Sequence, residues 1–253
     1  MKKYTKRPKE KQLLIGRQPL LEALREAVPI EKIWIKRSLV RENLQEVFAL
    51  AQQQNIPVQE VPIEKLHSLT DKNHQGIIAW ISAVPYQNLE DILSQVYDTG
   101  EIPLFLLLDG ITDVRNVGAI ARSALCFGAQ AMIVPQKGSA ALNEDALKTS
   151  AGALLKIPVC RAVSLRQAIS YLQDNGLQIV AADASGEVLL SQADLRIPTA
   201  IVLGDEGSGV DAAHLQTADV VVQIPMREDF DSLNVSVAAG VLLYEAAQQR
   251  TRG

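Results

Sequence analysis

The sequence is poor in the residues that build metal and disulfide frameworks. Among its 253 residues are two cysteines and three histidines. Cys126 and Cys160 form no CxxC pair, and no histidine stands beside them at a ligand spacing, which argues against a zinc site or a disulfide framework. Both cysteines are expected to be small core residues of a protein in the reducing cytoplasm, and no metal is expected.

Long apolar runs are also missing. The longest obvious one, "IPLFLLLDG", has the length of a strand and stops at Asp109, far short of a membrane span. The first residues, "MKKYTKRPKEKQ", are basic but lack the apolar stretch of a secretory signal. Neither membrane insertion nor export is therefore expected, and a cytoplasmic location is.

Three common catalytic and phosphate-binding motifs are absent. There is no GxxxxGK[ST], which excludes the phosphate loop of nucleoside triphosphatases. No GxGxxG follows the first strand of the second half, which weakens a dinucleotide site, and no GxSxG elbow occurs.

Charge is distributed unevenly along the chain. Residues 1–85 hold 14 Lys and Arg against 9 Asp and Glu, whereas residues 86–253 hold 11 against 20, which together give the net charge of −4. The first part could approach a polyanion, and the second would not do so unaided. The basic tail, residues 1–11, is equally well explained as a solvated terminus.

The hydrophobic pattern predicts two domains. Residues 12–85 alternate amphipathic helices, such as "QPLLEALREAV", with short strands, such as "KIWIK", and end in the β-rich "HQGIIAWISAV". Residues 86–100 are expected to be a linker that contains a helix. Residues 101–253 alternate fully apolar strands with helices, which predicts an α/β fold with a parallel sheet covered on both faces.

Three segments that follow strands of this second domain carry unusual polar residues. The first contains Arg115, Asn116 and Arg122, the second is "VLGDEGSGV" with Glu206, and the third is "IPMREDFDSLNVSV" with Ser232 and Asn234. Ligands of parallel sheets bind beyond the carboxyl ends of the strands, so we expect these segments to converge. Taken singly, each has an ordinary explanation: a glycine turn, a surface arginine, or a helix N-cap at Ser232.

In this order and spacing, "NVGAIARSALCFGA", "IVLGDEGSGV" and "IPM…SLNVSVAAGVLLYE" resemble the three motifs of the SpoU branch of the SPOUT RNA methyltransferases. The resemblance covers nearly the whole chain, since "IGRQPLLEAL" and "HQGIIA" are similar to the small RNA-binding domain that precedes the catalytic domain. It is close to the bacterial enzymes that methylate a guanosine ribose 2′-hydroxyl in 23S rRNA.

The resemblance implies S-adenosylmethionine as cofactor, a trefoil knot in the C-terminal domain and a homodimer that acts on rRNA. The implied roles cover fifteen residues. They are catalysis for Arg122, Asn116, Glu206, Ser232 and Asn234, cofactor binding for Leu203, Gly204, Gly209, Ile224, Met226 and Leu233, and RNA binding for Arg115, Arg17, His74 and Gln75. Glu206 is expected to hold Asn116 or Arg122 in place.

Two features complicate the implied mechanism. The family assigns proton acceptance to the arginine that matches Arg122, although a guanidinium keeps its proton at neutral pH, so we expect Arg122 at least to orient phosphate and to stabilise the developing alkoxide. The segment "REDFD" places acidic residues where many relatives have a glycine. It could repel RNA locally.

Three alternatives stay open at this point. The α/β pattern alone also fits a nicotinamide-dependent oxidoreductase. A non-catalytic RNA-binding protein would keep the fold without methyl transfer. Within the same family, the substrate could be tRNA or another rRNA site linked to antibiotic resistance. The leading domain favours rRNA, and no short motif encodes the target nucleotide.

Overall fold

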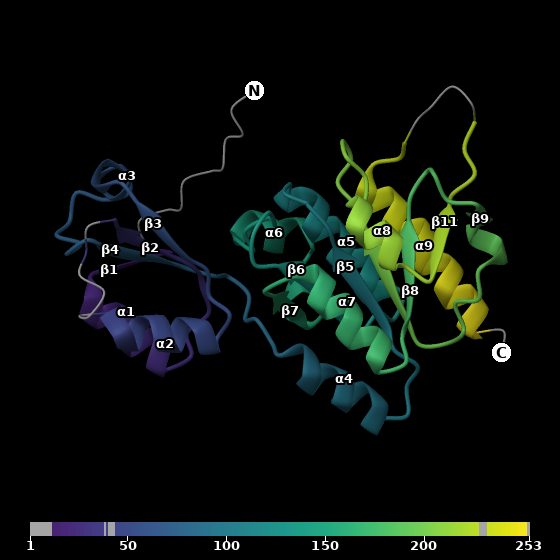
Figure 1. Ribbon diagram of the computed structural model, residues 1–253, viewed down its shortest axis with the longest axis horizontal. Coiled ribbons are helices and arrows are strands. Elements are labelled where there is room, and N and C mark those ends of the chain that lie inside the picture. The colour runs from purple at the N-terminus through teal and green to yellow at the C-terminus, as the bar shows by residue number, and fades with distance from the viewer. Residues whose placement is uncertain (1–11, 38, 40–43, 228–231, 252–253) are drawn as a thin grey trace. The chain divides into compact units, whose positions relative to one another are not determined.

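A computed structural model of the protein describes residues 12–37, 39, 44–227 and 232–251 (Figure 1). The basic tail and residues 228–231 of the "REDFD" segment lie outside the described residues. The chain divides into two compact units, Met1–Pro85 and Tyr86–Gly253, and each is described by itself.

The first unit is a small mixed sheet with helices. In chain order, its elements are β1 (Leu13–Ile15), α1 (Arg17–Arg25), β2 (Ile30–Lys36), α2 (Gln45–Gln53), β3 (Val58–Val61), α3 (Ile63–His67) and β4 (Ile77–Ile81). The strand order is β1-β4-β2-β3, with β2 and β3 parallel and β4 antiparallel to both neighbours. The sequence pattern did not predict β1 and α3.

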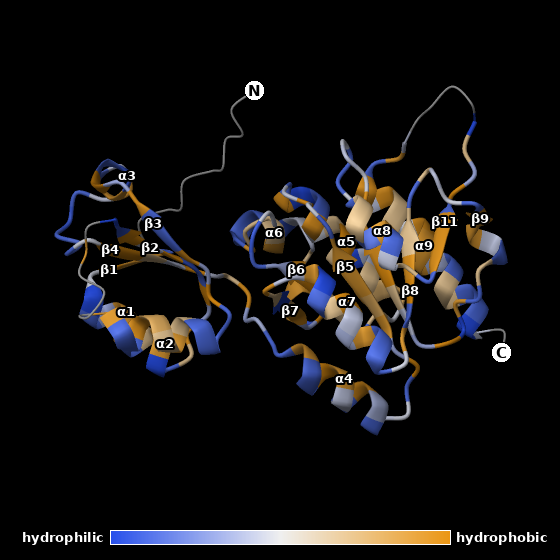
Figure 2. Ribbon diagram, viewed as in Figure 1, coloured by the Kyte–Doolittle hydropathy of each residue, from blue (hydrophilic) through white to orange (hydrophobic). Residues whose placement is uncertain are grey.

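The core of the first unit lies between the sheet and one pair of helices. Leu20 and Leu24 of α1 and Val47 of α2 pack with Ile33 and Ala79 of the sheet. These helices show apolar and polar faces in Figure 2, as amphipathic helices on a half-covered sheet should. The ends of β1, β2 and β3 and the start of β4 lie at one edge of this sheet.

The second unit is built on a parallel sheet. Its elements in chain order are α4 (Leu89–Asp98), β5 (Leu104–Leu108), α5 (Val114–Cys126), β6 (Ala131–Pro135), α6 (Glu144–Thr149), β7 (Val159–Ala162), α7 (Leu165–Asp174), β8 (Gln178–Ala182), β9 (Val188–Leu189), β10 (Thr199–Leu203), α8 (Ala212–Thr217), β11 (Val220–Gln223) and α9 (Val235–Thr251), with two short 3₁₀ turns at Ala153–Leu155 and Leu190–Gln192. Within the described residues the strand order is β7-β6-β5-β10-β8-β11-β9, and all pairs are parallel.

Helices cover both faces of this sheet, which confirms the predicted α/β class. Residues of α4 and α7 share a core cluster with Phe105 of β5 and Val202 of β10, while α5 packs against α6 and α9. The strands are hydrophobic along most of their length in Figure 2, because neither face meets water. The expected linker differs in one respect: Ile92, Leu93 and Val96 of α4 belong to the core of the second unit.

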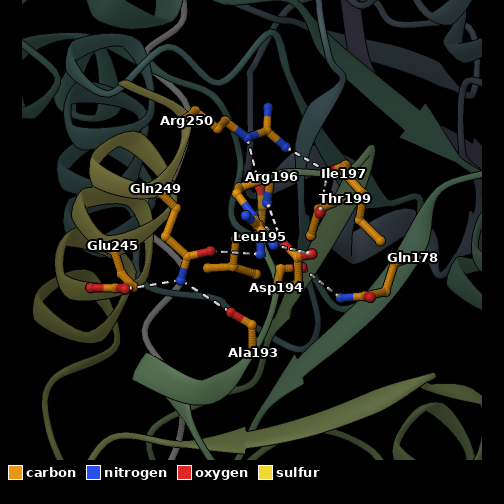
Figure 3. Close-up of polar contacts among 10 residues, drawn as sticks. All are labelled: Gln178, Ala193, Asp194, Leu195, Arg196, Ile197, Thr199, Glu245, Gln249 and Arg250. Atoms are coloured by element: carbon orange, nitrogen blue, oxygen red, sulfur yellow. Dashed lines mark hydrogen bonds and ion pairs between the residues drawn. The ribbon is translucent and has the colours of Figure 1, made fainter. Parts of the chain in front are cut away.

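Arg250 fixes the last turn of α9 to the amino ends of β5 and β10. Its guanidinium donates to four backbone carbonyls, those of Ile102 at 2.7 Å and of Pro103, Leu195 and Ile197 at 2.9 Å. Figure 3 shows Arg250 and Gln249 directed at the segment that precedes β10. Burial lowers the pKa of Arg250 to about 10, and the carbonyl oxygens offset the loss of water around the charge.

Candidate functional site

The three polar segments predicted to converge do meet at the carboxyl edge of the larger sheet. Leu108 ends β5 directly beside Leu203, which ends β10, so the first two segments leave neighbouring strands. The third segment follows β11 and leads into α9, which packs against α5. The arrangement agrees with the rule that parallel sheets bind ligands beyond these strand ends.

Glu206 joins side chains of all three segments. Its Oε1 accepts a hydrogen bond from Asn116 Nδ2 at 2.8 Å and another, very short one from Asn234 Nδ2. Asn234 Nδ2 also donates to Asn116 Oδ1 at 3.2 Å. The expected hydrogen bond between Glu206 and Asn116 is therefore confirmed, and Asn234 is a second donor to the same oxygen. A carboxylate that accepts two amide donors fixes the orientation of both amides.

The helix that follows begins later than the sequence suggests. We expected α9 to start near Ser232 with Ser232 as its N-cap, but it starts at Val235. Asn234 Oδ1 instead accepts from the Ser236 backbone N–H at 3.0 Å and from Ser236 Oγ at 2.5 Å. The prediction that Ser232 caps the helix is therefore wrong, because Asn234 satisfies the first free N–H. Ser232 is exposed two residues before the cluster.

A tight turn after β10 brings the chain back onto itself at Gly204. The Gly209 N–H donates to the Asp205 carbonyl at 2.8 Å. A Cβ at Gly204 would stand 2.0 Å from the Gly209 carbonyl carbon and 2.1 Å from Val210 N, so only glycine fits there. Gly209 itself has φ +68°, in the region that favours glycine.

The apolar residues expected to bind the cofactor lie at different depths. Leu203 is buried in β10, Ile224 and Leu233 are half-buried, and Met226 is 38% exposed. Ile224, Met226 and Leu233 flank the segment of which residues 228–231 lie outside the described part of the chain, whereas Leu203 ends β10. A half-exposed apolar rim beside a glycine turn fits a flat, partly apolar ligand such as an adenosyl group.

Asp109 and His214 lie within ion-pair distance of each other beside this turn. This contact was not predicted from the sequence. His214 Nδ1 lies 2.8 Å from Asp109 Oδ2, which also accepts from the Asp211 N–H at 2.8 Å. The pair links the end of β5 to α8. An aspartate directly after a fully buried strand was the available signal, but the sequence does not reveal that His214 would reach it.

Two arginines of α5 differ in their surroundings. Arg115 donates to Asp113, with Nη2 to Oδ2 at 2.7 Å, and the hydrogen bond from this side chain is the main cause that holds the pKa of Asp113 below its usual value. Arg122 is exposed and makes no hydrogen bond or ion pair with any described residue. The alternative that Glu206 holds Arg122 is therefore not what this single chain shows.

The RNA-binding residues predicted in the first unit lie together. The Arg17 N–H points to Gln75 Oε1 at 3.5 Å, and His74 Nδ1 accepts from the Gly76 N–H at 3.0 Å. Gln75 and Gly76 have φ of +51° and +81°. His74 is only 6% exposed, and burial, followed by the charge of His67, lowers its pKa.

The described ranges hold neither a cluster of metal-ligating side chains nor a membrane-crossing helix. No group of three or more His, Cys, Asp or Glu side chains there has the geometry to hold a metal ion. No helix in those ranges combines the length and the apolar character that a membrane crossing requires.

Fold and site define an α/β protein whose parallel sheet presents a polar cluster and a glycine turn at its ligand-binding edge. The chain belongs to the SpoU rRNA methylase family, which it matches over residues 103–244. Residues 13–87 match the family described as RNA 2′-O ribose methyltransferase substrate binding. The predicted class, an RNA methyltransferase, is thereby confirmed.

Curated relatives are similar over nearly the full chain. An uncharacterized tRNA/rRNA methyltransferase of Mycobacterium ulcerans is 39% identical over 96% of this chain and 79% of its own length. The putative TrmH family tRNA/rRNA methyltransferase YacO of Bacillus subtilis is 33% identical over 94% of this chain and 95% of its own length.

Among solved structures, the SpoU methyltransferase AviRb of Streptomyces viridochromogenes, in complex with the cofactor AdoMet, is 25% identical and superposes with a TM-score of 0.62. That similarity covers 95% of this chain and 91% of AviRb. The expectation of S-adenosylmethionine as cofactor agrees with the AdoMet bound to this family member.

Proposed function

We propose that the protein transfers a methyl group from S-adenosylmethionine to the ribose 2′-hydroxyl of a guanosine in 23S rRNA. The observation that carries this proposal is the Glu206 cluster, which ties Asn116 and Asn234 into one polar group beside the Gly204 turn. The reaction takes place in the cytoplasm, where rRNA is available.

The residues at the edge of the sheet suit an adenosyl ligand. Gly204 leaves no room for a side chain, so the backbone itself forms the wall of the site. Leu203, Ile224 and Leu233 supply apolar contacts, and backbone amides of the turn supply donors. When bound, S-adenosylmethionine supplies a methyl group that its sulfonium has already activated.

The remaining task of the protein is to align the ribose oxygen and to allow its proton to leave. The carbon–sulfur bond would break as the carbon–oxygen bond forms, which leaves the sulfur as a neutral thioether, and the hydroxyl proton would pass to solvent water, because the Arg122 guanidinium already carries its proton. The amide groups of Asn116 and Asn234, fixed by Glu206, orient the reacting groups, and Ser232 stands exposed at the entrance. Arg122 holds the adjacent phosphate and stabilises the developing alkoxide.

A homodimer is part of the proposal because the exposed Arg122 makes no hydrogen bond or ion pair with the Glu206 cluster in one chain. The same region exposes apolar side chains: Leu125 of α5 is 37% exposed, and Val237 and Tyr244 of α9 are 52% and 51% exposed. Phe127 and Tyr244 meet edge to face at 5.9 Å, which connects the two helices across this surface. A second copy would cover the surface and bring its arginine to the site.

The C-terminal trefoil knot is likewise proposed. After β10 the chain adds β11 beyond β8, at a distance from β5, and then returns through α9 to pack against α5. A chain end threaded through the segments that follow the strands would account for such a return.

The first unit is proposed to select the RNA. It carries the excess of basic residues, and Arg17, His74 and Gln75 lie together at one edge of its sheet. Arg115 adds a phosphate contact near the catalytic cluster, in competition with Asp113.

The proposal is tested by transfer of labelled methyl from S-adenosylmethionine to unmethylated 23S rRNA and, in parallel, to unmodified tRNA. Resistance of one phosphodiester to alkaline cleavage maps a 2′-O-methyl group. Label on one rRNA guanosine is the expected result. Label on tRNA or on another nucleotide would overturn the substrate, and RNA binding without any transfer would identify a non-catalytic protein.

The role of Arg122 has its own test. Arg122→Lys keeps the charge but loses the planar fork, so turnover should fall about tenfold or more if the fork grips a phosphate. Arg166→Lys, on α7 of the opposite face, is the matched control. Near-normal turnover of Arg122→Lys would exclude a bidentate role.

A further inference from the structure

A hollow in the first unit lies outside the catalytic cluster. It measures about 470 Å³, within the roughly 300–1,000 Å³ typical of small-ligand sites. Its polar lining includes Lys36, His67, Asp71, Lys72, His74 and Gln75. The end of β2, the end of α3 and the turn before β4 supply these residues, so the hollow lies at the sheet edge where β1, β2 and β3 end.

Two imidazole rings form one part of this hollow. The ring centroids of His67 and His74 are 5.1 Å apart and the ring planes are tilted by 52°. His67 is exposed at the last position of α3, while His74 is buried. The exposed ring of His67 therefore offers an aromatic surface to the hollow, and the buried ring of His74 lies next to it.

The hydrogen bond from Gly76 fixes the tautomer of His74. Because the Gly76 N–H donates to Nδ1, the neutral ring carries its proton on Nε2. Nε2 makes no hydrogen bond with a described residue. Because His74 lines the hollow, Nε2–H is the ring donor that a ligand there could use.

Cations stand at the rim. Lys36 lines the hollow and forms no ion pair with any described carboxylate, and Lys72 lines it beside Asp71. The backbone makes a tight turn here: Gln75 has φ +51°, and its N–H donates to Asn73 Oδ1 at 3.3 Å. A phosphate would meet positive charge at the rim and a base would meet rings and a donor inside.

We propose that this hollow binds one unstacked nucleotide of the RNA substrate, with its base against His67, an acceptor atom of the base on His74 Nε2–H, and its phosphate beside Lys36. The inference rests on the proposed function for the identity of the polymer. It assigns the first unit the recognition of a nucleotide that has left a helix, which is how proteins commonly read RNA sequence.

The three histidines of the chain, at positions 67, 74 and 214, make this testable by NMR. A short single-stranded RNA, titrated into the full-length protein, should shift the ring signals of His67 and His74 by more than that of His214, which lies beside the Gly204 turn of the second unit. A blunt duplex of the same composition should shift them little. Equal shifts with inorganic phosphate, equal shifts with the duplex, or no shift at all would overturn the proposal.

Matched variants separate stacking from charge. His67→Ala should weaken single-stranded RNA binding about tenfold, and His67→Phe should restore most of it, since stacking contributes about 1–3 kcal/mol per base. Lys36→Ala should lower the slope of log K against log salt by about one. Lys65→Ala removes a cation from α3 outside the hollow and should change neither quantity.

The readouts keep this inference distinct from the proposed function. Ring shifts without methyl transfer to any RNA would retain the nucleotide site and reject the methyltransferase proposal. Methyl transfer whose KM for RNA is unchanged in both His67→Ala and Lys36→Ala would retain the activity and reject the site.

Discussion

The two units position their functional groups in different ways. In the second unit, Glu206 reaches Asn116 across 90 positions of the sequence and Asn234 across 28. In the first unit, the contacts that shape the turn join residues two positions apart, His74 with Gly76 and Asn73 with Gln75. The catalytic cluster depends on long-range contacts alone, whereas in the first unit local hydrogen bonds shape the turn and Lys36 and His67 reach the same hollow from other elements.

Because of this difference, the two sites should respond differently to substitutions. A long-range cluster is lost when any of its three segments moves, so its activity should be lost in the same transition that unfolds the second unit. A local turn keeps its internal hydrogen bonds when neighbouring residues are changed, so single substitutions around it should each weaken RNA binding in part.

The largest effect is expected at Gly204. Gly204→Ala would force a Cβ to within 2.0 Å of the backbone of Gly209, and we expect a loss of more than about 3 kcal/mol in the stability of the second unit. Gly207→Ala is the control, because a Cβ there meets only Asp205 Oδ2 at 3.6 Å. Both tryptophans, Trp34 and Trp80, lie in the first unit, so their unchanged fluorescence would show that the damage is confined.

A smaller but still large effect is expected for the carboxylate itself. Glu206→Ala frees both asparagine amides and should lower kcat about 100-fold, or about 2.7 kcal/mol, while Glu206→Gln should lie between it and the native protein. Methyl incorporation under saturating RNA measures this. Asp174→Ala, at the C-terminal end of α7, is the control. An equal loss in the control would mean that Glu206 acts only through general charge.

Arg250 should affect stability more than catalysis. Arg250→Met removes all four hydrogen bonds and should cost the second unit about 2 kcal/mol, although Gln130 and Thr199 still donate to three of the carbonyls. Denaturant unfolding followed by circular dichroism reports it. Arg196→Met removes an exposed pair with Asp194 and should cause no measurable change. If Arg250→Met unfolds at the same denaturant midpoint as the native protein, the hydrogen bonds to the carbonyls make no net contribution to stability.

The smallest effect is a pH dependence of the first unit. Burial lowers the pKa of His74 below its usual 6.5, so the unfolded chain binds a proton that the folded ring resists. Stability should therefore fall as the pH drops below about 6.5. His74→Asn keeps an acceptor for the Gly76 N–H and removes the titration. Tryptophan fluorescence during unfolding at pH 7.5 and 5.5 should show the difference only in the native protein; an equal drop in the variant would assign it to other groups.

Much of the second unit follows from its sequence, since uniformly apolar strands such as Leu104–Leu108 are typical of a sheet covered on both sides. The meeting of the three polar segments followed from strand direction. The start of α9 could not be predicted in this way, because serine and asparagine are both good N-cap residues. The hydrogen bond from Asn234 to Glu206, which favours Asn234 over Ser232, is a tertiary contact that the local sequence does not show.

Other features were beyond sequence reasoning for physical reasons. The polar helix α8, "AAHLQT", has no buried residue and therefore no apolar periodicity to detect. His67 and His74 lie in different elements, so their ring contact depends on how α3 folds over β2. Arg250 resembles any basic residue near a helix end, and only the structure shows its four carbonyl partners.

The Arg250 contacts impose an order on the synthesis of the chain. Ile102 and Pro103 leave the ribosome long before residue 250, which stands 148 and 147 positions later. In the folded unit these carbonyls also accept from Gln130 Nε2 at 3.3 Å and from the Thr199 N–H at 2.9 Å, so the strands can pair before residue 250 is made. A chain stopped before residue 250 should therefore keep its paired strands and lack only the attachment of the last turn of α9.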